Sequence, residues 1–445
     1  MSASSSVALR ARGPLAALDG ATRVALVDRA STTDASVRSR TTAIIEQVRA
    51  RGDAALIDFA RDFDRVTLTT PEVPRAEWDA ALATLDAGLR QSLERAARNI
   101  AAVHTAFRPT ETVCSPEPGI TVGRRPDPLQ RVGIYAPGGR AAYPSSLLMG
   151  AIPARVAGVH EVIVCSPPGP DGKPSAVVLA AAALANVDRV FSLGGAGAIA
   201  ALAVGTESVP RVDRIMGPGN AYVAEAKLQL VNAVAIDSPA GPSELLVLGD
   251  SSAKADAVAR EMMAQAEHDP DAAVVTILAG DDVDLLANDV RTALAAQLAT
   301  APRADVVRAS LAARGAIVTV PLLSEAIAFT NEWAAEHLLL VVRDDVRDST
   351  LAALRNAGTI FVGASSSVAY GDYMTGANHV LPTAGAGRSY SGLSTLDFVR
   401  WTTWQEVTPA AAARLAEDVG RFADAEGLPA HAAAARAWIT TGSTR

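Results

Sequence analysis

Residues 131–137 (RVGIYAP), 144–159 (PSSLLMGAIPARVAGV) and 161–167 (EVIVCSP) show the pattern that decides the fold expected of this chain. Two short apolar runs flank a longer helical stretch, and the same alternation continues through RVFSLGG, AGAIAALAVG and VDRIMGPG. Strands that alternate with helices in this way build βαβ units and a parallel sheet. We therefore predict one α/β domain over residues 131–242.

A second series with the same alternation runs from SELLVLGD, which begins at Ser243, to TIFVGA, which ends at Ala364. It predicts a second parallel sheet. The expected fold class is α/β, with two Rossmann-like parallel-sheet domains, a helical N-terminal segment and a small helical C-terminal tail. The two series share an architecture but no evident sequence repeat.

The flanking regions complete the expected domain plan. Residues 31–130 plus 243–391 are expected to form the first α/β domain, because apolar residues recur at helical spacing through much of the N-terminal part. The Pro-rich stretch 109–130 predicts a connection or a short hairpin. Residues 392–445, which include DFVRWTTWQEV, are expected to be helical. Residues 1–30 are expected to be a leader, a short disordered or surface-lying extension.

Composition excludes several classes of function. Hydrophobic residues make up 49% of the 445 residues, and the formal net charge is −8. No basic stripe stands out, so we do not expect nucleic-acid binding. The longest apolar runs are about half of the roughly 20 residues that cross a bilayer, so we expect no membrane span. Two cysteines are too few for a disulfide framework. We expect a cytoplasmic protein.

The stretch GDYMTGANHVLPTAGAGRSYSG, residues 371–392, is a candidate functional loop. Its five glycines and one proline exclude a regular helix interior, and loops of this length inside a domain are uncommon unless they are functional or disordered. Its apolar side chains argue against disorder. We therefore expect an ordered loop that presents Asp372 and His379 to a site.

Four side chains could form a metal site. Gln265 and His268 are three residues apart at a helix end, so both can reach one point. Asp372 would add a carboxylate oxygen, and His431 a second imidazole. Such a nitrogen and oxygen donor set suits zinc, with manganese or cobalt possible. The spacing matches no recognised zinc motif. The alternative is a helix end capped by His268.

Glu336 and His337 lie side by side where a helix is followed by the strand HLLLVV. An acid next to a histidine can perform acid–base chemistry near neutral pH. The same pair can also arise from composition alone.

The run Gly195-Ala196-Gly197-Ala198-Ile199-Ala200 follows an expected strand and opens an expected helix. It matches the dinucleotide fingerprint, which is a weak signal in a chain rich in alanine and glycine. Asp213 is near the distance at which an acid would hold a ribose.

Six motifs in series make the chain similar to histidinol dehydrogenase: RVGIYAPGGRAAYPSSLLMGAIPARVAGV, GPGNAYVAEAK, DSPAGPSELLV, QAEHDPDA, NEWAAEHLL and GDYMTGANHVLPT. The similarity runs in order from about residue 30 to about residue 436. That family oxidises L-histidinol to L-histidine with two NAD⁺ at a zinc site in a homodimer. The resemblance therefore implies zinc, NAD⁺ and shared active sites, with residues 131–242 on the NAD side and residues 392–445 contributing to the dimer.

The resemblance also implies roles for single residues. Glu336 and His337 resemble the acid–base pair, and four residues resemble the zinc ligands: Gln265, His268, Asp372 and His431. These six are also expected to contact substrate, together with Ser243, His379 and Glu426. His431 and Glu426 would come from the partner subunit. Tyr135 and Asn220 resemble NAD contacts.

One departure from the family pattern concerns the cofactor. The family usually has glutamine in the third place of GGAQA, where this chain has Gly197, so this NAD contact is doubtful here. Two other functions stay open. One is a related zinc- and NAD-dependent dehydrogenase of another small polar alcohol, such as a sulfonated diol. The other is a catalytically silent paralogue that binds ligand only.

Overall fold

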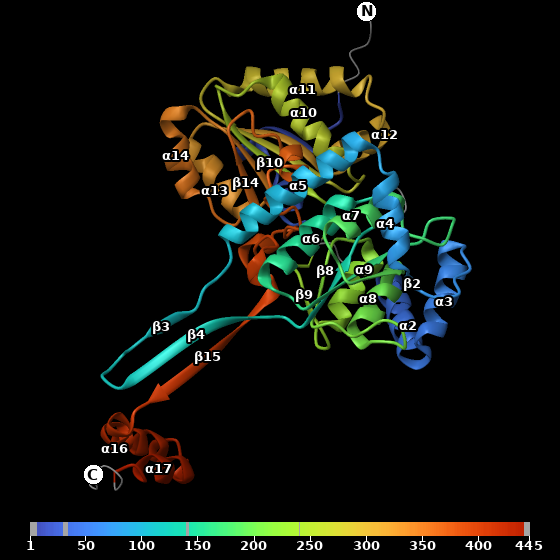
Figure 1. Cartoon of the computed structure of the whole chain (residues 1–445). Helices are drawn as coiled ribbons and strands as arrows, with labels where there is room; N and C mark the ends of the chain where they lie inside the picture. The colour runs from blue at the N-terminus through green and yellow to red at the C-terminus, as the bar shows by residue number, and fades with distance from the viewer. Residues whose placement is uncertain (1–6, 30–33, 139–141, 240, 440–445) are drawn as a thin grey trace, which may run out of the picture.

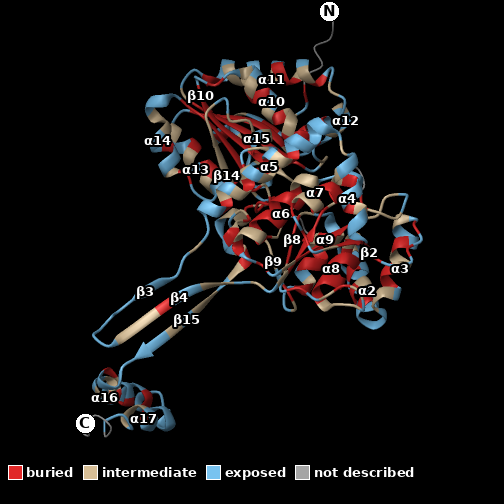
Figure 2. Ribbon diagram, in the orientation of Figure 1, coloured by how far each residue is buried: buried red, intermediate tan, exposed pale blue. Residues whose placement is uncertain are grey.

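The structure is a computed structural model that describes residues 7–29, 34–138, 142–239 and 241–439. Two α/β domains pack against each other, and a long antiparallel ribbon projects from them and ends in two helices (Figure 1). Buried residues gather in the strands and inner helices of the two domains, whereas the ribbon is mostly exposed or half-buried (Figure 2).

Sheet A has six strands, and every neighbouring pair runs parallel. Its order is β1-β12-β11-β10-β13-β14. Its central strands are buried along their whole length, as expected where helices cover both faces of a parallel sheet. The strands are β1 (Ala11–Pro14), β10 (Glu244–Asp250), β11 (Ala273–Ala279), β12 (Gly315–Val320), β13 (His337–Val341) and β14 (Thr359–Val362).

Sheet B also has six strands, in the order β2-β7-β6-β5-β8-β9. Only the edge strand β2 runs antiparallel to its neighbour, and the other pairs are parallel. The strands are β2 (Glu72–Val73), β5 (Arg131–Tyr135), β6 (Glu161–Ser166), β7 (Arg189–Ser192), β8 (Arg214–Met216) and β9 (Ala235–Ile236).

The parallel cores of the two sheets share one topology. Taken in chain order, both follow the pattern 3-2-1-4-5, with the order reversing beside β10 in sheet A and beside β5 in sheet B. This is the doubly wound arrangement of Rossmann-like domains. The predicted fold class, with two Rossmann-like parallel-sheet domains, is therefore confirmed.

Helices complete the two domains. Those of the sheet A domain are α1 (Gly20–Val27), α10 (Ala255–Ala266), α11 (Val283–Leu298), α12 (Ala304–Arg314), α13 (Leu323–Trp333), α14 (Asp344–Ala353) and α15 (Val368–Tyr373). Those of the sheet B domain are α2 (Ala35–Arg51), α3 (Asp53–Phe59), α4 (Arg75–Thr84), α5 (Ala87–Ala106), α6 (Pro144–Ala157), α7 (Ala176–Leu184), α8 (Gly195–Val204) and α9 (Ala221–Leu230).

The first 30 residues differ from the expected leader. Within their described part, β1 pairs with β12 as the edge strand of sheet A, and Leu15 and Leu26 lie in the core. The Arg29 side chain is buried as well. A segment that carries buried apolar residues and a strand register is part of the domain, so the leader assignment was wrong for these residues.

The N-terminal helices also differ from the expected plan, which grouped residues 31–130 with residues 243–391. Instead α2 packs on α8 and α9, α4 packs on α7, and α5 packs on α6. The short strand β2 then adds to sheet B. The helical spacing predicted the helices but carried no information about which sheet their apolar faces would cover.

The ribbon consists of β3 (Thr112–Cys114), β4 (Ile120–Pro128) and β15 (Val399–Val407), paired antiparallel. The hairpin alternative for residues 109–130 is therefore confirmed. The expected helical tail is present as α16 (Pro409–Ala425) and α17 (Pro429–Arg436), but the Trp-bearing stretch before it is strand, not helix. Its alternating side chains suit a two-sided ribbon better than a helix. No helix in the described residues is long and apolar enough to cross a membrane.

His104, in α5, is a buried titratable residue outside any predicted site, with a relative exposure of 1%. Its carbonyl oxygen accepts a hydrogen bond from the Thr395 hydroxyl at 2.8 Å, whereas its Nε2 has no hydrogen-bond partner within the described residues. Burial lowers the pKa of His104 to about 4. The folded protein therefore keeps this imidazole neutral in mild acid.

We predict that His104 makes the fold acid-sensitive. Between about pH 6.5 and pH 4 the unfolded chain binds a proton at this residue that the folded chain does not, so acidification lowers the free energy of unfolding, by about 3 kcal/mol in total. Denaturant unfolding at several pH values should give a flatter pH dependence for His104→Leu than for the unmodified protein. Equal slopes for the two proteins would contradict the prediction.

Candidate active site

The acid–base candidates lie at the start of a central strand of sheet A. His337 is the first residue of β13 and pairs in register with Leu245 of β10. Between α13 and Glu336 the chain turns at Ala334, which adopts the left-handed conformation with φ of 53°. This turn brings Glu336 and His337 to the amino-terminal edge of the sheet, where both are nearly fully buried.

The main chain of Glu244, the first residue of β10, holds both candidates. Its N–H donates to Glu336 Oε2 at 2.6 Å, and its carbonyl oxygen lies 3.0 Å from His337 Nδ1. Because a carbonyl only accepts, Nδ1 carries the proton that makes this bond. The other ring nitrogen, Nε2, is then directed away from the strand.

His337 Nε2 lies 3.6 Å from Asp372 Oδ1, and no hydrogen-bond partner occurs for it within the described residues. Burial opposes a charge on this ring, but the carboxylates of Glu336 and Asp372 outweigh burial and raise the pKa of His337 to about 10. Burial likewise acts to raise the pKa of Asp372, yet the nearby rings of His337, His379 and His268 hold it below its usual value. The site is an electrostatically coupled set of acids and imidazoles.

Gln265 lies in the last turn of α10, and His268 follows the C-cap residue of that helix. The Glu261 carboxylate, one turn earlier on α10, accepts a hydrogen bond at 3.0 Å from the N–H of Val368, which opens α15. Asp372 lies one turn further along α15, and the charge of His268 acts on it. Gln265 is 3% exposed, and its amide nitrogen has no hydrogen-bond partner in the described part of the chain.

Residues 371–392 are only partly the loop that we expected, because α15 continues to Tyr373. The rest of the loop is bonded to the sheet B domain, because the Asn378 side chain donates a hydrogen bond to the Met149 carbonyl oxygen at 2.7 Å. His379 Nδ1 lies 2.9 Å from the carbonyl oxygen of Asp372, so Nδ1 donates, and Nε2 can accept from the Ser146 hydroxyl at 3.2 Å. Burial lowers the pKa of His379. Asp372 and His379 are thus brought together.

Ser243 directly precedes β10, and its carbonyl oxygen accepts a hydrogen bond from the N–H of Ala273 at 3.1 Å. It therefore lies next to Glu244, at the same sheet edge as the acid–base candidates. Two contributors were missed from sequence: Glu244 and Ser146. The acid that opens the apolar strand ELLVLGD was an available signal for Glu244, whereas nothing in the sequence links Ser146 to His379.

The predicted cofactor residues gather at the carboxyl-terminal edge of sheet B. Tyr135 ends β5, and its hydroxyl accepts a hydrogen bond from the N–H of Gly195 at 3.0 Å. A Cβ at Gly217 would lie 2.1 Å from the carbonyl oxygen of Tyr135, so only glycine fits this turn. Asn220 caps α9, with its side chain accepting from two N–H groups of the first turn. These turns surround the position where doubly wound sheets bind ligands.

Gly197 lies in the first turn of α8, where a Cβ would stand 3.0 Å from the Phe59 ring. The Phe59 ring therefore lies close to the position that the first side-chain atom of any other residue at position 197 would occupy. Asp213 lies at the opposite edge of sheet B, before β8, and accepts a hydrogen bond from the N–H of Arg131 at 2.9 Å. It therefore cannot hold a ribose beside Gly195.

Glu426 and His431 are exposed on the helices at the far end of the ribbon, away from the other predicted site residues (Figure 1). Within the residues that the structure describes, no group of three His, Cys, Asp or Glu side chains is placed to hold a metal ion. One chain thus places Asp372 beside His337 and within the electrostatic influence of His268, but His431 lies on α17 at the far end of the ribbon.

Comparisons with known proteins agree with one another. A family model described as histidinol dehydrogenase matches residues 27–438. The histidinol dehydrogenase of Methanosarcina mazei is 44% identical over 404 residues, which cover 91% of this chain and 92% of that protein. That of Bordetella parapertussis is 46% identical over 406 residues, with 91% of each covered. The crystal structure of histidinol dehydrogenase from Elizabethkingia anophelis matches with a TM-score of 0.92 and 31% identity, covering 98% of this chain and 99% of that one.

We predict that Gly197→Gln destabilises the fold because its side chain must displace the Phe59 ring. Overpacking of this kind costs about 1–3 kcal/mol, of which the better helix propensity of glutamine offsets a part. Denaturant unfolding should show that Phe59→Ala relieves the effect, so that the double variant is more stable than the sum of the single effects implies.

The matched control is Phe63→Ala, which removes the ring stacked on Phe59, with centroids 5.5 Å apart, but none of the atoms nearest to position 197. Its effect should add to that of Gly197→Gln. If the effects of Gly197→Gln and Phe59→Ala on the free energy of unfolding are strictly additive, positions 197 and 59 do not compete for space.

Proposed function

The chain belongs to the histidinol dehydrogenase family, and on that premise we propose that it oxidises L-histidinol to L-histidine through bound histidinaldehyde, with two NAD⁺ as hydride acceptors. The reaction consumes one water and yields two NADH and three protons. The observation that carries the proposal is the buried pair of Glu336 and His337, both held by the main chain of Glu244.

The pair suits two successive oxidations. With Nδ1–H fixed on a carbonyl oxygen, and with Asp372 committed to a metal ion so that the ring is neutral, His337 would offer Nε2 to accept the hydroxyl proton as the first hydride leaves the carbinol carbon. The Glu336 carboxylate, 3.5 Å from the same ring, would activate water to add to the aldehyde. The second hydride would leave from the resulting hydrate, giving the carboxylate. Burial of both groups keeps the aldehyde away from bulk water.

We propose that Gln265, His268, Asp372 and the partner subunit's His431 hold a zinc ion. The donor set of two imidazoles, a carboxylate and an amide suits zinc, and the buried amide of Gln265 lacks a partner for its nitrogen. Zinc bound there would orient the substrate through its amine and imidazole nitrogens. Commitment of Asp372 to the metal would also remove one of the two carboxylates that raise the pKa of His337.

We propose a homodimer with shared active sites, and the position of the ribbon supports it. The helices α16 and α17 pack on each other and leave large apolar side chains exposed, at Val419 44%, Phe422 76% and Leu428 41%. Exposed apolar side chains of this kind are best explained if another subunit covers them. The ribbon would carry Glu426 and His431 to the partner's site, where Glu426 would contact the distal end of the substrate.

On the cofactor side, Tyr135 and Asn220 would contact NAD⁺ at the carboxyl-terminal edge of sheet B. The glycine turn after β8 supports this, because it lines a cavity of about 320 Å³ together with Thr383 and Ala384 from the loop beside Glu244. Gly197 offers no side chain for such a contact.

One observation disfavours a sulfonated substrate. The only cation in the stretch EGLPAHAAAAR, residues 426–436, is Arg436. It is paired with Glu417 at 3.2 Å and with Asp424 at 2.8 Å, so its charge is already compensated. Retention of the acid–base pair argues against a silent paralogue.

We predict that the purified protein reduces NAD⁺ with L-histidinol, yielding two NADH per histidinol, and that a chelator abolishes the reaction until zinc is restored. In Glu336→Gln the first hydride transfer should proceed and the second should stall, because the amide cannot activate water. NADH absorbance in a single turnover would then show one NADH per site. A full yield from this variant would refute the assigned role of Glu336.

We predict that His431→Ala loses zinc while remaining folded, which metal analysis and circular dichroism would show. Mixing it with Glu336→Gln under conditions of subunit exchange should restore activity, because one site of each hybrid then receives all its residues intact from the two chains. Each variant alone should remain inactive in full turnover. If mixing restores nothing although hybrids form, the sites are not shared.

A further inference from the structure

Arg29 forms a buried ion pair with Glu244 in the sheet A domain. Its Nε donates to Glu244 Oε1 at 2.7 Å, and a terminal nitrogen donates to Glu244 Oε2 at 3.1 Å. Both side chains are 3% exposed, although the two residues are 215 positions apart in the chain. A two-pronged contact of this kind fixes the orientation of both partners, as well as pairing their charges.

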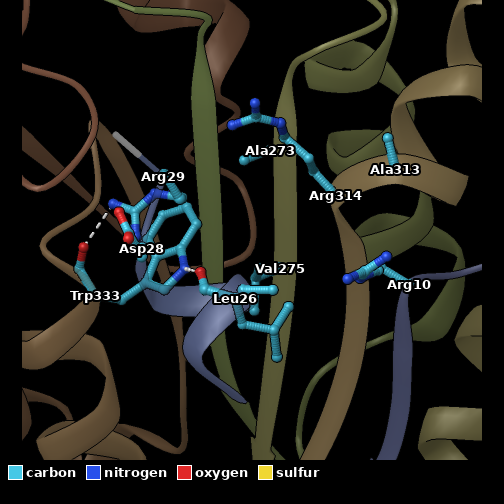
Figure 3. Close-up of a pocket in the computed structure, with 10 residues that line it drawn as sticks. Arg10, Leu26, Asp28, Arg29, Ala273, Val275, Ala313, Arg314 and Trp333 are labelled. Atoms are coloured by element: carbon cyan, nitrogen blue, oxygen red, sulfur yellow. Dashed lines mark hydrogen bonds between the residues drawn. The ribbon is translucent and has the colours of Figure 1, made fainter. Parts of the chain in front are cut away.

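The same guanidinium also binds the last residue of α13. It donates to the carbonyl oxygen of Trp333 at 2.6 Å and lies 3.6 Å from the centroid of the Trp333 ring. In Figure 3 the guanidinium lies against the indole, whose nitrogen donates to the Leu26 carbonyl oxygen at 2.8 Å. Glu336 follows Trp333 by only three residues. Arg29 therefore fixes the turn that leads into the acid–base pair.

Glu244 connects Arg29 to the acid–base pair. Its side chain accepts from Arg29 and from the N–H of Ala384 at 2.8 Å, while its main chain holds Glu336 and His337. A displacement of this one residue would thus move both members of the pair together.

We propose that Arg29 is a positioning residue of the active site, which acts through Glu244 and the end of α13 to hold Glu336 and His337 in their reactive geometry. This inference rests on the proposed function, in which that pair performs the proton transfers. Arg29 itself touches neither substrate nor reacting atoms.

Electrostatics supports the same role. Burial and the negative charge of Glu336 act to raise the pKa of Glu244, and Arg29 opposes both. Without Arg29, the buried carboxylate of Glu244 would stand beside that of Glu336 without a cation paired to it, and it would have to take up a proton or move toward solvent. Either response would disturb the hydrogen bonds that Glu244 makes to the pair.

The test uses the full-length, zinc-loaded protein with L-histidinol and NAD⁺. Arg29→Met removes the positive charge and the guanidinium group that makes the two-pronged contact. Arg29→Lys keeps the charge but cannot make the two-pronged contact, so it tests position in a variant that folds. We expect kcat to fall roughly 100-fold in Arg29→Met and roughly 10-fold in Arg29→Lys, since small misplacements of catalytic groups have effects of this size. KM for both substrates and the zinc content should stay unchanged.

The matched control is Arg314→Met. Arg314 lines the same cavity of about 270 Å³ as Arg29, and its side chain makes no hydrogen bond or ion pair within the described residues (Figure 3). This variant removes the same charge from the same cavity and should retain wild-type kcat. Comparable losses of kcat in Arg314→Met and Arg29→Met would overturn the inference.

A second experiment distinguishes a positioning role of Arg29 from general damage to the structure. If Arg29 acts through the pair, Arg29→Met should slow the second hydride transfer little further in a Glu336→Gln background, because that step is already impaired. Unchanged kcat in folded Arg29→Lys and Arg29→Met, or full additivity with Glu336→Gln, overturns the inference. A Glu336→Gln protein with a full NADH yield would instead refute the proposed function, whatever Arg29 does.

Discussion

The structure depends on one constraint, that the carboxylate of Glu244 is buried and must be paired. An unpaired buried carboxylate costs several kcal/mol, and Arg29 supplies the pairing from a segment more than 200 residues earlier in the chain. That contact draws residues 11–29 into the sheet A domain, where β1 becomes an edge strand. It also fixes the first residue of β10, whose main chain holds Glu336 and His337.

The two doubly wound sheets have the same topology but offer opposite edges to the site. Sheet B presents the carboxyl-terminal edge, with Tyr135 and the glycine turn after β8, as such sheets usually do. Sheet A presents its amino-terminal edge, because its polar groups precede β10 and β13. The loop after α15 spans both, bonded to α6 through Asn378 and to Glu244 through Ala384. A proposed cofactor side and a proposed acid–base side are thereby joined by one segment.

The ribbon follows a different logic. Its strands satisfy one another's backbone groups, so it can extend from the domains without a core of its own. The helices at its end carry exposed apolar side chains together with Glu426 and His431. A single chain therefore leaves Glu426 and His431 far from the acid–base pair, which fits the proposed sharing of sites between subunits. Membership of the histidinol dehydrogenase family gives this arrangement its chemical meaning.

The sequence by itself determined the α/β class, the two parallel sheets and the family, because alternating apolar runs and contiguous motifs are local signals. It misassigned residues 11–29, the helices α2 to α5 and the strand β15, since hydrophobic periodicity predicts an element but does not identify the surface that it covers. Likewise, Glu336 and His337 were recognisable as adjacent acid and base, whereas the pairing of Glu244 with Arg29 was not. Their importance arises from a burial and a distance that exist only after the chain has folded. Tertiary structure alone decided which carboxylate needed a cation, and thus which residues set the geometry of the site.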